Sequence, residues 1–158
     1  MASELKISRL KAWSIGTLRL FVSALFLVAG VLKLRDADAT LVAVYQYKLL
    51  SWEAAGLAAT FLPCVEITAA LALWIPRARL GATALCLALN LLFLAALASA
   101  VARNLDVSCG CFGTSDLYTS ALTRMVEDVV LLLPSLLLWR SASQEHCARL
   151  QSALENGN

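Results

Sequence analysis

The stretch "LGATALCLALNLLFLAALASAV", residues 80–101, decides the fold class of this chain, because it carries no charged side chain. A helix rises about 1.5 Å per residue, so roughly 20 apolar residues cross the ~30 Å hydrocarbon core of a bilayer. Comparable apolar stretches lie on both sides of it. The sequence therefore predicts an all-α integral membrane protein.

We predict four transmembrane helices packed as a bundle in one domain, residues 1–158. The composition agrees, since 60% of the residues are hydrophobic and the mean hydropathy is +0.75. The tryptophans lie near the predicted span ends, where indole rings favour the headgroup layer. The tails before and after the spans are expected to form a short interfacial helix and a short fraying helix. The predicted spans are residues 15–34, 52–75, 80–101 and 120–139.

Lysine and arginine set the predicted orientation, because cytoplasmic loops carry an excess of them. The inner side would hold Lys6, Arg9, Lys11, Arg77, Arg79, Arg140 and Arg149, and the outer side Lys33, Arg35, Lys48, Arg103 and Arg124. The connection around Arg77 is purely basic, whereas the first outer loop balances its bases with Asp36 and Asp38. We therefore predict both termini in the cytoplasm of a bacterium, with the protein in its inner membrane and in contact with the lipid bilayer. No basic run suggests nucleic acid.

Two thiols lie in the third connection, "DVSCGCFGTSDL", residues 106–117, which this topology places outside the cytoplasm. Extended residues i and i+2 are at most about 7 Å apart, and Gly110 lets the backbone bend until Cys109 and Cys111 can form a disulfide. Phe112 and Gly113 would seat the loop on the membrane and turn the chain. A strained, exposed disulfide exchanges readily.

Three interpretations of this pair stay open: a redox-active dithiol, a structural bridge, or a thiolate site for Cu(I) or another soft metal. The single histidine, His146, lies in the tail, so we predict no histidine-based metal site and assign no metal ligand. Cys64 and Cys86 fall inside predicted spans and are expected to act as small hydrophobic residues. Cys147 is expected to be a reduced thiol of the inner tail.

A carboxylate at Glu66 lies in the second span and must find a partner or stay protonated. Counting depth along the two spans brings Arg19 near it, so we predict an Arg19–Glu66 pair, with a proton- or quinone-linked role as the alternative. Pro63 should kink the helix and open a cavity that Asn90 could line.

The fourth span begins with an i,i+4 pair, Arg124 and Asp128, on one helix face. We expect both to point into the bundle or toward the outer loop, where they would place a positive centre near the thiols. The plainer alternative is a neutralised helix start.

The chain resembles the MauE branch of the DoxX-like membrane proteins through three motifs: "RLFVSALFLVAGVLKLRDADATLVAVYQYKLL" from Arg19, "LPCVE" in the second span and "CGCFG" before the fourth. Arg19, Lys33, Tyr47, Pro63 and Glu66 occur in the matching order. The resemblance implies a four-helix transmembrane fold. It also implies work with periplasmic thioredoxin-like proteins in disulfide formation, as in maturation of the methylamine dehydrogenase small subunit.

The chain departs from the family pattern in two places, with Ser108 before the "CGC" motif and Cys64 where an aromatic residue is common. Neither change touches the thiols, so the resemblance implies a redox role for Cys109 and Cys111. A thiolate would exchange with a thioredoxin-like partner's disulfide, and a quinone in the Pro63/Glu66/Asn90 cavity could take the electrons. The alternatives are a non-catalytic subunit of a larger membrane complex and a copper-handling protein.

Overall fold

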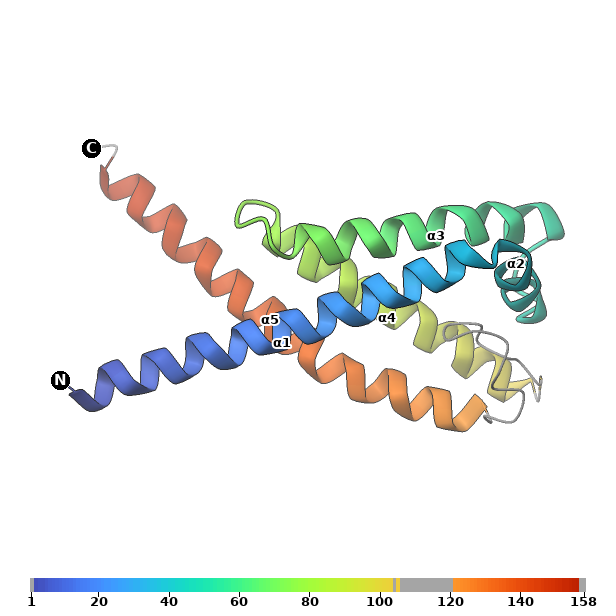
Figure 1. The fold of residues 1–158 in the computed structure, drawn as a ribbon, viewed down its shortest axis with the longest axis horizontal. Helices are drawn as coiled ribbons and strands as arrows, with labels where there is room; N and C mark the ends of the chain where they lie inside the picture. Colours follow the sequence, from blue (N-terminus) through green and yellow to red (C-terminus); the bar gives the residue numbers. More distant parts are fainter. Residues whose placement is uncertain (1, 104, 106–120, 157–158) are drawn as a thin grey trace.

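The computed structural model describes residues 2–103, 105 and 121–156, and in this part of the chain it contains five helices and no strand (Figure 1). The all-α prediction is therefore confirmed. The helices are α1 (Ala2–Arg35), α2 (Ala37–Gln46), α3 (Trp52–Ala72), α4 (Arg79–Ala102) and α5 (Ala121–Asn156).

Four of the helices are long, and they run past one another while α2 lies at one end (Figure 1). α3 packs against α1 and α2, and α4 packs mainly against α5. The N-terminal half of α1 and the C-terminal half of α5 both project beyond α3 and α4, at the end opposite α2. The molecule therefore has two distinct ends, one with α2 and one with the two projecting helices.

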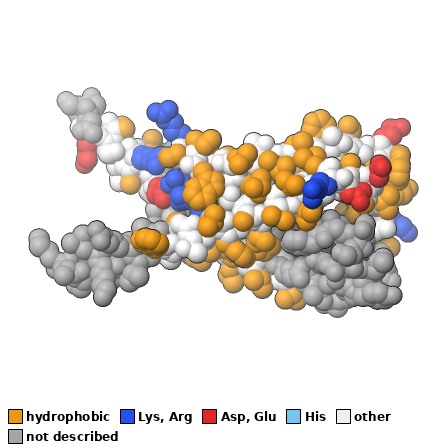
Figure 2. All heavy atoms as spheres, viewed as in Figure 1, with side chains coloured by type: hydrophobic (Ala, Val, Ile, Leu, Met, Phe, Trp, Pro, Cys, Tyr) orange, Lys and Arg blue, Asp and Glu red, His pale blue; other side chains and the backbone are white. Residues whose placement is uncertain are grey.

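Three helices are long and apolar enough to cross a membrane: Trp13–Arg35 within α1, then Trp52–Ala72 and Arg79–Ala102. Within the described residues, α5 does not meet the same standard, so the predicted fourth span, residues 120–139, stays a prediction. Large apolar side chains such as Leu57 and Phe61, each 63% exposed, point outward rather than into the bundle. Figure 2 shows hydrophobic side chains over the middle of the visible face and most charged groups toward its ends. Such a surface suits lipid contact.

Local signals explain where α2 and α3 begin. The Asp36 carboxylate accepts the Ala39 N–H at 3.0 Å, and the Ser51 hydroxyl accepts the Ala54 N–H at 3.4 Å. Both are side-chain caps for helix N–H groups that lack an intrahelical partner. After α2, Lys48 adopts a left-handed backbone (φ 51°), which turns the chain toward α3.

The elements differ from our predictions in three respects. The first outer connection contains α2, which we had treated as a loop. The predicted interfacial helix of the first tail is continuous with the first span, as the single helix α1. The final tail likewise continues α5 to Asn156. No Gly or Pro lies at the junction in α5, and in α1 the single Gly16 near the junction does not interrupt the helix.

α1 and α3 lie antiparallel at close range. A Cβ at Gly30 would lie 2.7 Å from Ile67 Cγ1 and 3.0 Å from the Pro63 carbonyl oxygen, so only glycine fits there. Further along, the Ser23 hydroxyl donates to the Ala70 carbonyl at 3.0 Å and accepts the Trp74 indole N–H at 3.1 Å. These contacts set the register of the two helices.

The main apolar core lies where α1, α4, α5 and the end of α3 meet. It is built of small and medium side chains, so the helices can approach one another closely. Its buried members are Val22, Ala69, Leu73, Ala82, Cys86 and Leu138.

Candidate functional site

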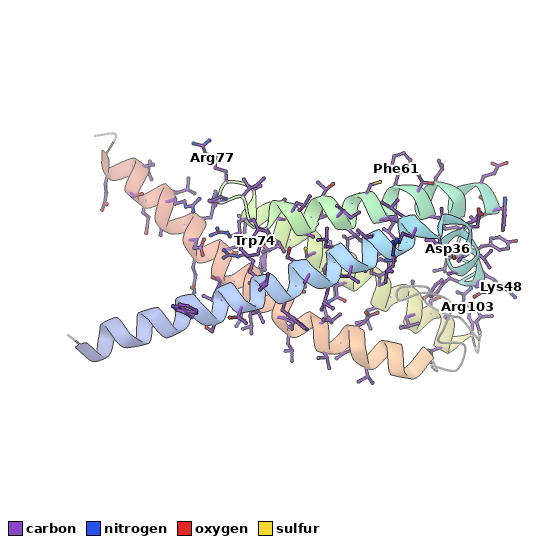
Figure 3. All side chains as sticks on the ribbon, in the orientation of Figure 1. Asp36, Lys48, Phe61, Trp74, Arg77 and Arg103 are labelled. Carbon is purple, nitrogen blue, oxygen red and sulfur yellow. The ribbon has the colours of Figure 1, made fainter. Side chains whose placement is uncertain are left out.

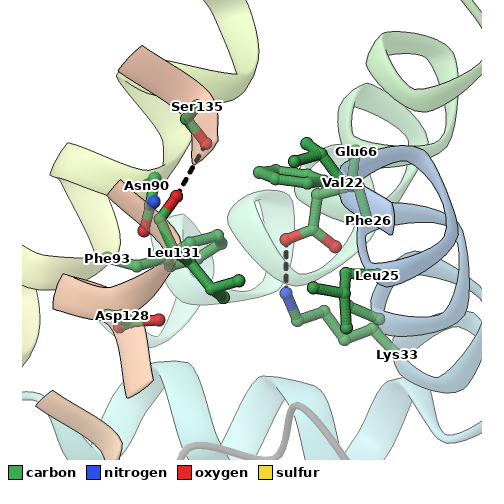
Figure 4. A pocket seen from close by; sticks show the side chains of 11 residues that line it. Val22, Leu25, Phe26, Lys33, Glu66, Asn90, Phe93, Asp128, Leu131 and Ser135 are labelled. Carbon is green, nitrogen blue, oxygen red and sulfur yellow. Dashed lines mark hydrogen bonds and ion pairs between the residues drawn. The ribbon is translucent and has the colours of Figure 1, made fainter. Parts of the chain in front are cut away.

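A cavity of about 80 Å³ lies at the centre of the four long helices (Figure 4). Apolar side chains supply most of its lining, chiefly from α1. Five polar or charged side chains also border it, and they come from all four helices: Lys33, Glu66, Asn90, Asp128 and Ser135. An apolar lining with a few convergent polar groups is typical of a small-molecule site, but this cavity is smaller than the roughly 300–1,000 Å³ of most ligand pockets.

A buried ion pair forms one wall of the cavity. The Lys33 ammonium of α1 donates to the Glu66 carboxylate of α3, and the two side chains are only 5% and 1% exposed. The Lys33 Nζ atom also lies 4.5 Å from the centre of the Phe93 ring, within the range of a cation–π contact. Thr40 of α2 donates to the Lys33 carbonyl at 3.1 Å, which ties α2 to the same place.

Two polar atoms at this cavity are buried and have no hydrogen-bond partner among the described residues: Glu66 Oε2 and Asn90 Nδ2. One is an acceptor and the other a donor. Figure 4 shows Asn90 and Asp128 on the wall facing Lys33 and Glu66, with the cavity between them. Buried polar groups are normally satisfied, so this pair could hold water or a polar group of a bound molecule.

The predicted Arg19–Glu66 pair is wrong, because Glu66 pairs with Lys33 and Arg19 lies 3.8 Å from Glu145. The register explains the error. Ser23 already lies opposite the end of α3, near Trp74, so Arg19 lies level with the turn that follows α3.

The depth of Glu66 predicted by counting from Trp52 is wrong, because α3 begins beyond the end of α1. The first turns of α3 pack on α2, where the Tyr45 and Trp52 rings lie 5.1 Å apart between their centres. The start of α3 at Trp52 and the end of α1 at Arg35 therefore lie at different depths along the bundle. Glu66 lies correspondingly closer to the end of α1.

The structure brings some of the predicted residues together and not others. Glu66 and Asn90 both border the cavity, whereas Pro63 does not and instead contacts the Gly30 face of α1. Asp128 is partly buried at the cavity. The Arg124 side chain lies outside the described part of the chain, so the Arg124–Asp128 pair stays a prediction.

The thiol motif also lies outside the described residues, and the roles of Cys109, Gly110, Cys111, Phe112 and Gly113 stay predictions. What the structure does show is where this segment starts. Figure 3 shows Arg103, just past the end of α4, at the same end of the molecule as Asp36 and Lys48. The Arg103 guanidinium donates to the carbonyls of Tyr47 at 2.5 Å and Lys48 at 3.3 Å. The segment therefore leaves α4 beside the turn that follows α2.

Sequence reasoning named Lys33 as a charge of the outer side and as a residue shared with the family, but it missed the pairing of Lys33 with Glu66. A signal was present, because Val22, Phe26, Ala29 and Lys33 follow one another at spacings of four, three and four. Such residues share one face of a helix. All four border the cavity.

The cysteines in the described part of the chain lie in three separate environments. Cys86 is buried in the apolar core, Cys64 is exposed and donates to the Thr60 carbonyl at 3.4 Å, and Cys147 is exposed on α5. Within the described ranges, no group of three or more His, Cys, Asp and Glu side chains could hold a metal ion.

Comparison with known proteins gives one consistent result. Residues 11–141 match the family "Methylamine utilisation protein MauE". The chain is 38% identical over 93 residues to methylamine utilization protein MauE of Methylophilus methylotrophus, covering 58% of this chain and 49% of that protein. It is 35% identical over 96 residues to the protein of the same name from Paracoccus denitrificans, covering 60% and 52%.

The chain spans about half the length of these curated relatives. No solved structure matches it. The family match and the three membrane-capable helices together identify a multi-pass membrane protein.

Proposed function

The chain belongs to the MauE family, and from that premise we propose that it is a membrane thiol–disulfide exchange protein whose reactive groups are Cys109 and Cys111. The observation that carries the proposal is the "CGCFG" motif, which lies between α4 and α5 inside the matched region. Its relatives are named for methylamine utilisation, and we propose that this chain serves the same process.

The exchange step conserves atoms and electrons. A thiolate at one cysteine attacks a sulfur of the partner's disulfide, and a mixed disulfide forms as the partner's other sulfur leaves as a thiolate. The second cysteine then attacks its neighbour's sulfur and releases the partner as a dithiol. Two electrons and two protons pass between the proteins, and the reverse sequence oxidises the partner. A thioredoxin-like protein outside the cytoplasm is the partner that suits this chemistry.

The proposed topology has four spans, with α5 as the fourth and both termini in the cytoplasm of the bacterial inner membrane. α4 ends and α5 begins at the same end of the molecule, which supports placing the thiol segment on one side (Figure 1). Arg77 lies toward the opposite end (Figure 3), and Arg79 follows it as the first residue of α4, consistent with the positive-inside rule. The thiols would then face the oxidising side of the membrane.

The central cavity is our candidate site for a quinone. Its apolar lining suits a quinone ring, Asn90 Nδ2 can donate to a quinone carbonyl, and Glu66 Oε2 can accept from a quinol hydroxyl. With a volume of about 80 Å³, the cavity would have to widen to admit the whole ligand. A quinone would accept two electrons and two protons from the Cys109/Cys111 dithiol, giving quinol and the disulfide. The alternative function is a non-catalytic subunit of a larger membrane complex, in which the disulfide is a structural clip.

The test compares partner oxidation in cells that carry the wild type, the Cys109→Ser/Cys111→Ser variant, or the control variant Cys64→Ser/Cys147→Ser. We expect the first variant to insert and fold normally, because four packed helices bury far more surface than one small ring constrains. The thioredoxin-like partner should lose its normal redox state in that variant alone. A normal partner in all three strains would exclude the exchange mechanism, and loss of assembly in the first variant would favour the structural clip.

A further inference from the structure

A second polar cluster lies at the end of the molecule away from α2, where α1, α4 and α5 meet. It consists of Arg19 of α1, Arg79 of α4 and Glu145 of α5. We propose that this cluster is a binding site for a phosphate group, supplied by an anionic phospholipid headgroup or by free phosphate. The proposal does not depend on the thiol chemistry.

The cluster has two cations for one anion. Arg79 Nη1 lies 2.5 Å from one carboxylate oxygen of Glu145, whereas Arg19 Nη2 is 3.8 Å from the other, too far for a hydrogen bond. Glu145 can neutralise only one of the two guanidinium groups. A full positive charge is therefore left at a partly buried place.

Both arginines also hold unused donors. Their Nε atoms are buried and have no acceptor among the described residues. The two side chains are only 14% and 15% exposed, so water has limited access to them. Buried donors without acceptors are costly, and an oxyanion with several oxygens would satisfy them.

Space for such a ligand exists on both sides of the ion pair. One cavity of about 430 Å³ borders Arg19, Arg79 and Glu145, and another of about 240 Å³ borders Arg79 and Glu145 together with Arg77 and Arg149. Among the residues that the structure describes, Glu145 is the only acidic one that lines either cavity. Four arginines against one carboxylate make this region strongly attractive to anions.

The depth of the cluster favours a lipid phosphate. Arg79 is the first residue of the membrane-capable helix α4, so it lies where hydrocarbon gives way to headgroups. The preceding residue, Ala78, has no side chain that could cap the helix, so the positive end of α4 adds to the attraction. Trp74, 51% exposed, lies nearby in the connection from α3 and suits the same layer.

The experiment titrates the purified full chain in neutral detergent with phosphatidylglycerol, phosphatidylcholine or inorganic phosphate, and measures binding by native mass spectrometry and calorimetry. Preference for phosphatidylglycerol over the other two assigns a lipid site, and equal binding of inorganic phosphate assigns an ion site. Absence of binding by both anions would overturn the proposal.

Three variants locate the site. Arg79→Gln should weaken binding about tenfold or more, whereas Arg35→Gln, an arginine exposed at the other end of α1, should leave it unchanged. Glu145→Gln removes the competing carboxylate and should tighten binding several-fold. A merely structural ion pair predicts no such gain, so unchanged or weaker binding in Glu145→Gln overturns the proposal even if Arg79→Gln fails to fold.

Discussion

Lys33 and Glu66 show at the scale of single residues how a charge is accommodated inside a membrane protein. Removing one partner leaves the other buried and unpaired, which costs about 3–5 kcal/mol in comparable cases, whereas replacing both with apolar groups is often neutral. We therefore expect Lys33→Met to lose about that much stability and Lys33→Met/Glu66→Met to regain most of it. Unfolding in detergent measures the stability of the single and the double variant. A single variant as stable as the wild type would show that the pair contributes little.

Asn90 and Ser135 border the same cavity but differ in their hydrogen bonds. The Asn90 amide nitrogen has no hydrogen-bond partner in the described part of the chain, whereas the Ser135 hydroxyl donates to the Leu131 carbonyl of its own helix at 2.9 Å. If the cavity binds a quinone, Asn90→Leu should slow quinone reduction by the pre-reduced protein about tenfold, and Ser135→Ala should change it little. Stopped-flow absorbance of the quinone provides the measurement, and equal rates in all three proteins would argue against this cavity as the quinone site.

The sequence predicted correctly that Glu66 needs a partner, because an isolated carboxylate in an apolar span is costly. It could not identify that partner. The choice between Arg19 and Lys33 depends on the relative depth of α1 and α3. That depth is set by the packing of α2 under α3. This is a tertiary contact, and the sequence around Arg19 or Lys33 carries no local signal of it.

At the scale of elements, the contact between α1 and α3 depends on one glycine. An added methyl group at Gly30 would collide with Ile67 and the Pro63 carbonyl, so Gly30→Ala should force the helices apart and cost about 1–3 kcal/mol. Gly16 on the same helix has nothing within 4 Å of the added atom. Gly16→Ala should therefore be neutral or gain up to about 1 kcal/mol from helix propensity. Thermal unfolding measures the stability of both variants, and an equal loss of stability in Gly30→Ala and Gly16→Ala would contradict this packing.

The long helices were predictable because apolar composition over roughly 20 residues depends only on local sequence. α3 and α4 end within three residues of the predicted bounds. α2 was not predictable in the same way, since it is short and its apolar residues follow no span-length pattern. The Asp36 cap and the alanine-rich "ADATLVAVYQ" that follows it were the available signals.

At the scale of the whole molecule, the proposed topology determines which thiols face the outside. An impermeant maleimide applied to intact spheroplasts after mild reduction should label Cys109 or Cys111 and spare Cys147, which lies on the projecting half of α5. Single-cysteine variants distinguish the sites, and permeabilised cells show that Cys147 can react. Labelling of Cys147 alone in intact spheroplasts would invert the topology and remove the thiols from the oxidising side.

The central claim, that Cys109 and Cys111 exchange disulfides with a partner, is tested most directly by trapping the covalent intermediate. In an exchange mechanism one cysteine attacks and the other resolves, so replacing the resolving cysteine alone stops the reaction at the mixed disulfide. We expect either Cys109→Ser or Cys111→Ser, but not the double variant, to give a reductant-sensitive complex with a thioredoxin-like protein after acid quenching and non-reducing electrophoresis. If neither single variant forms such a complex while both are inserted and folded, the claim is contradicted.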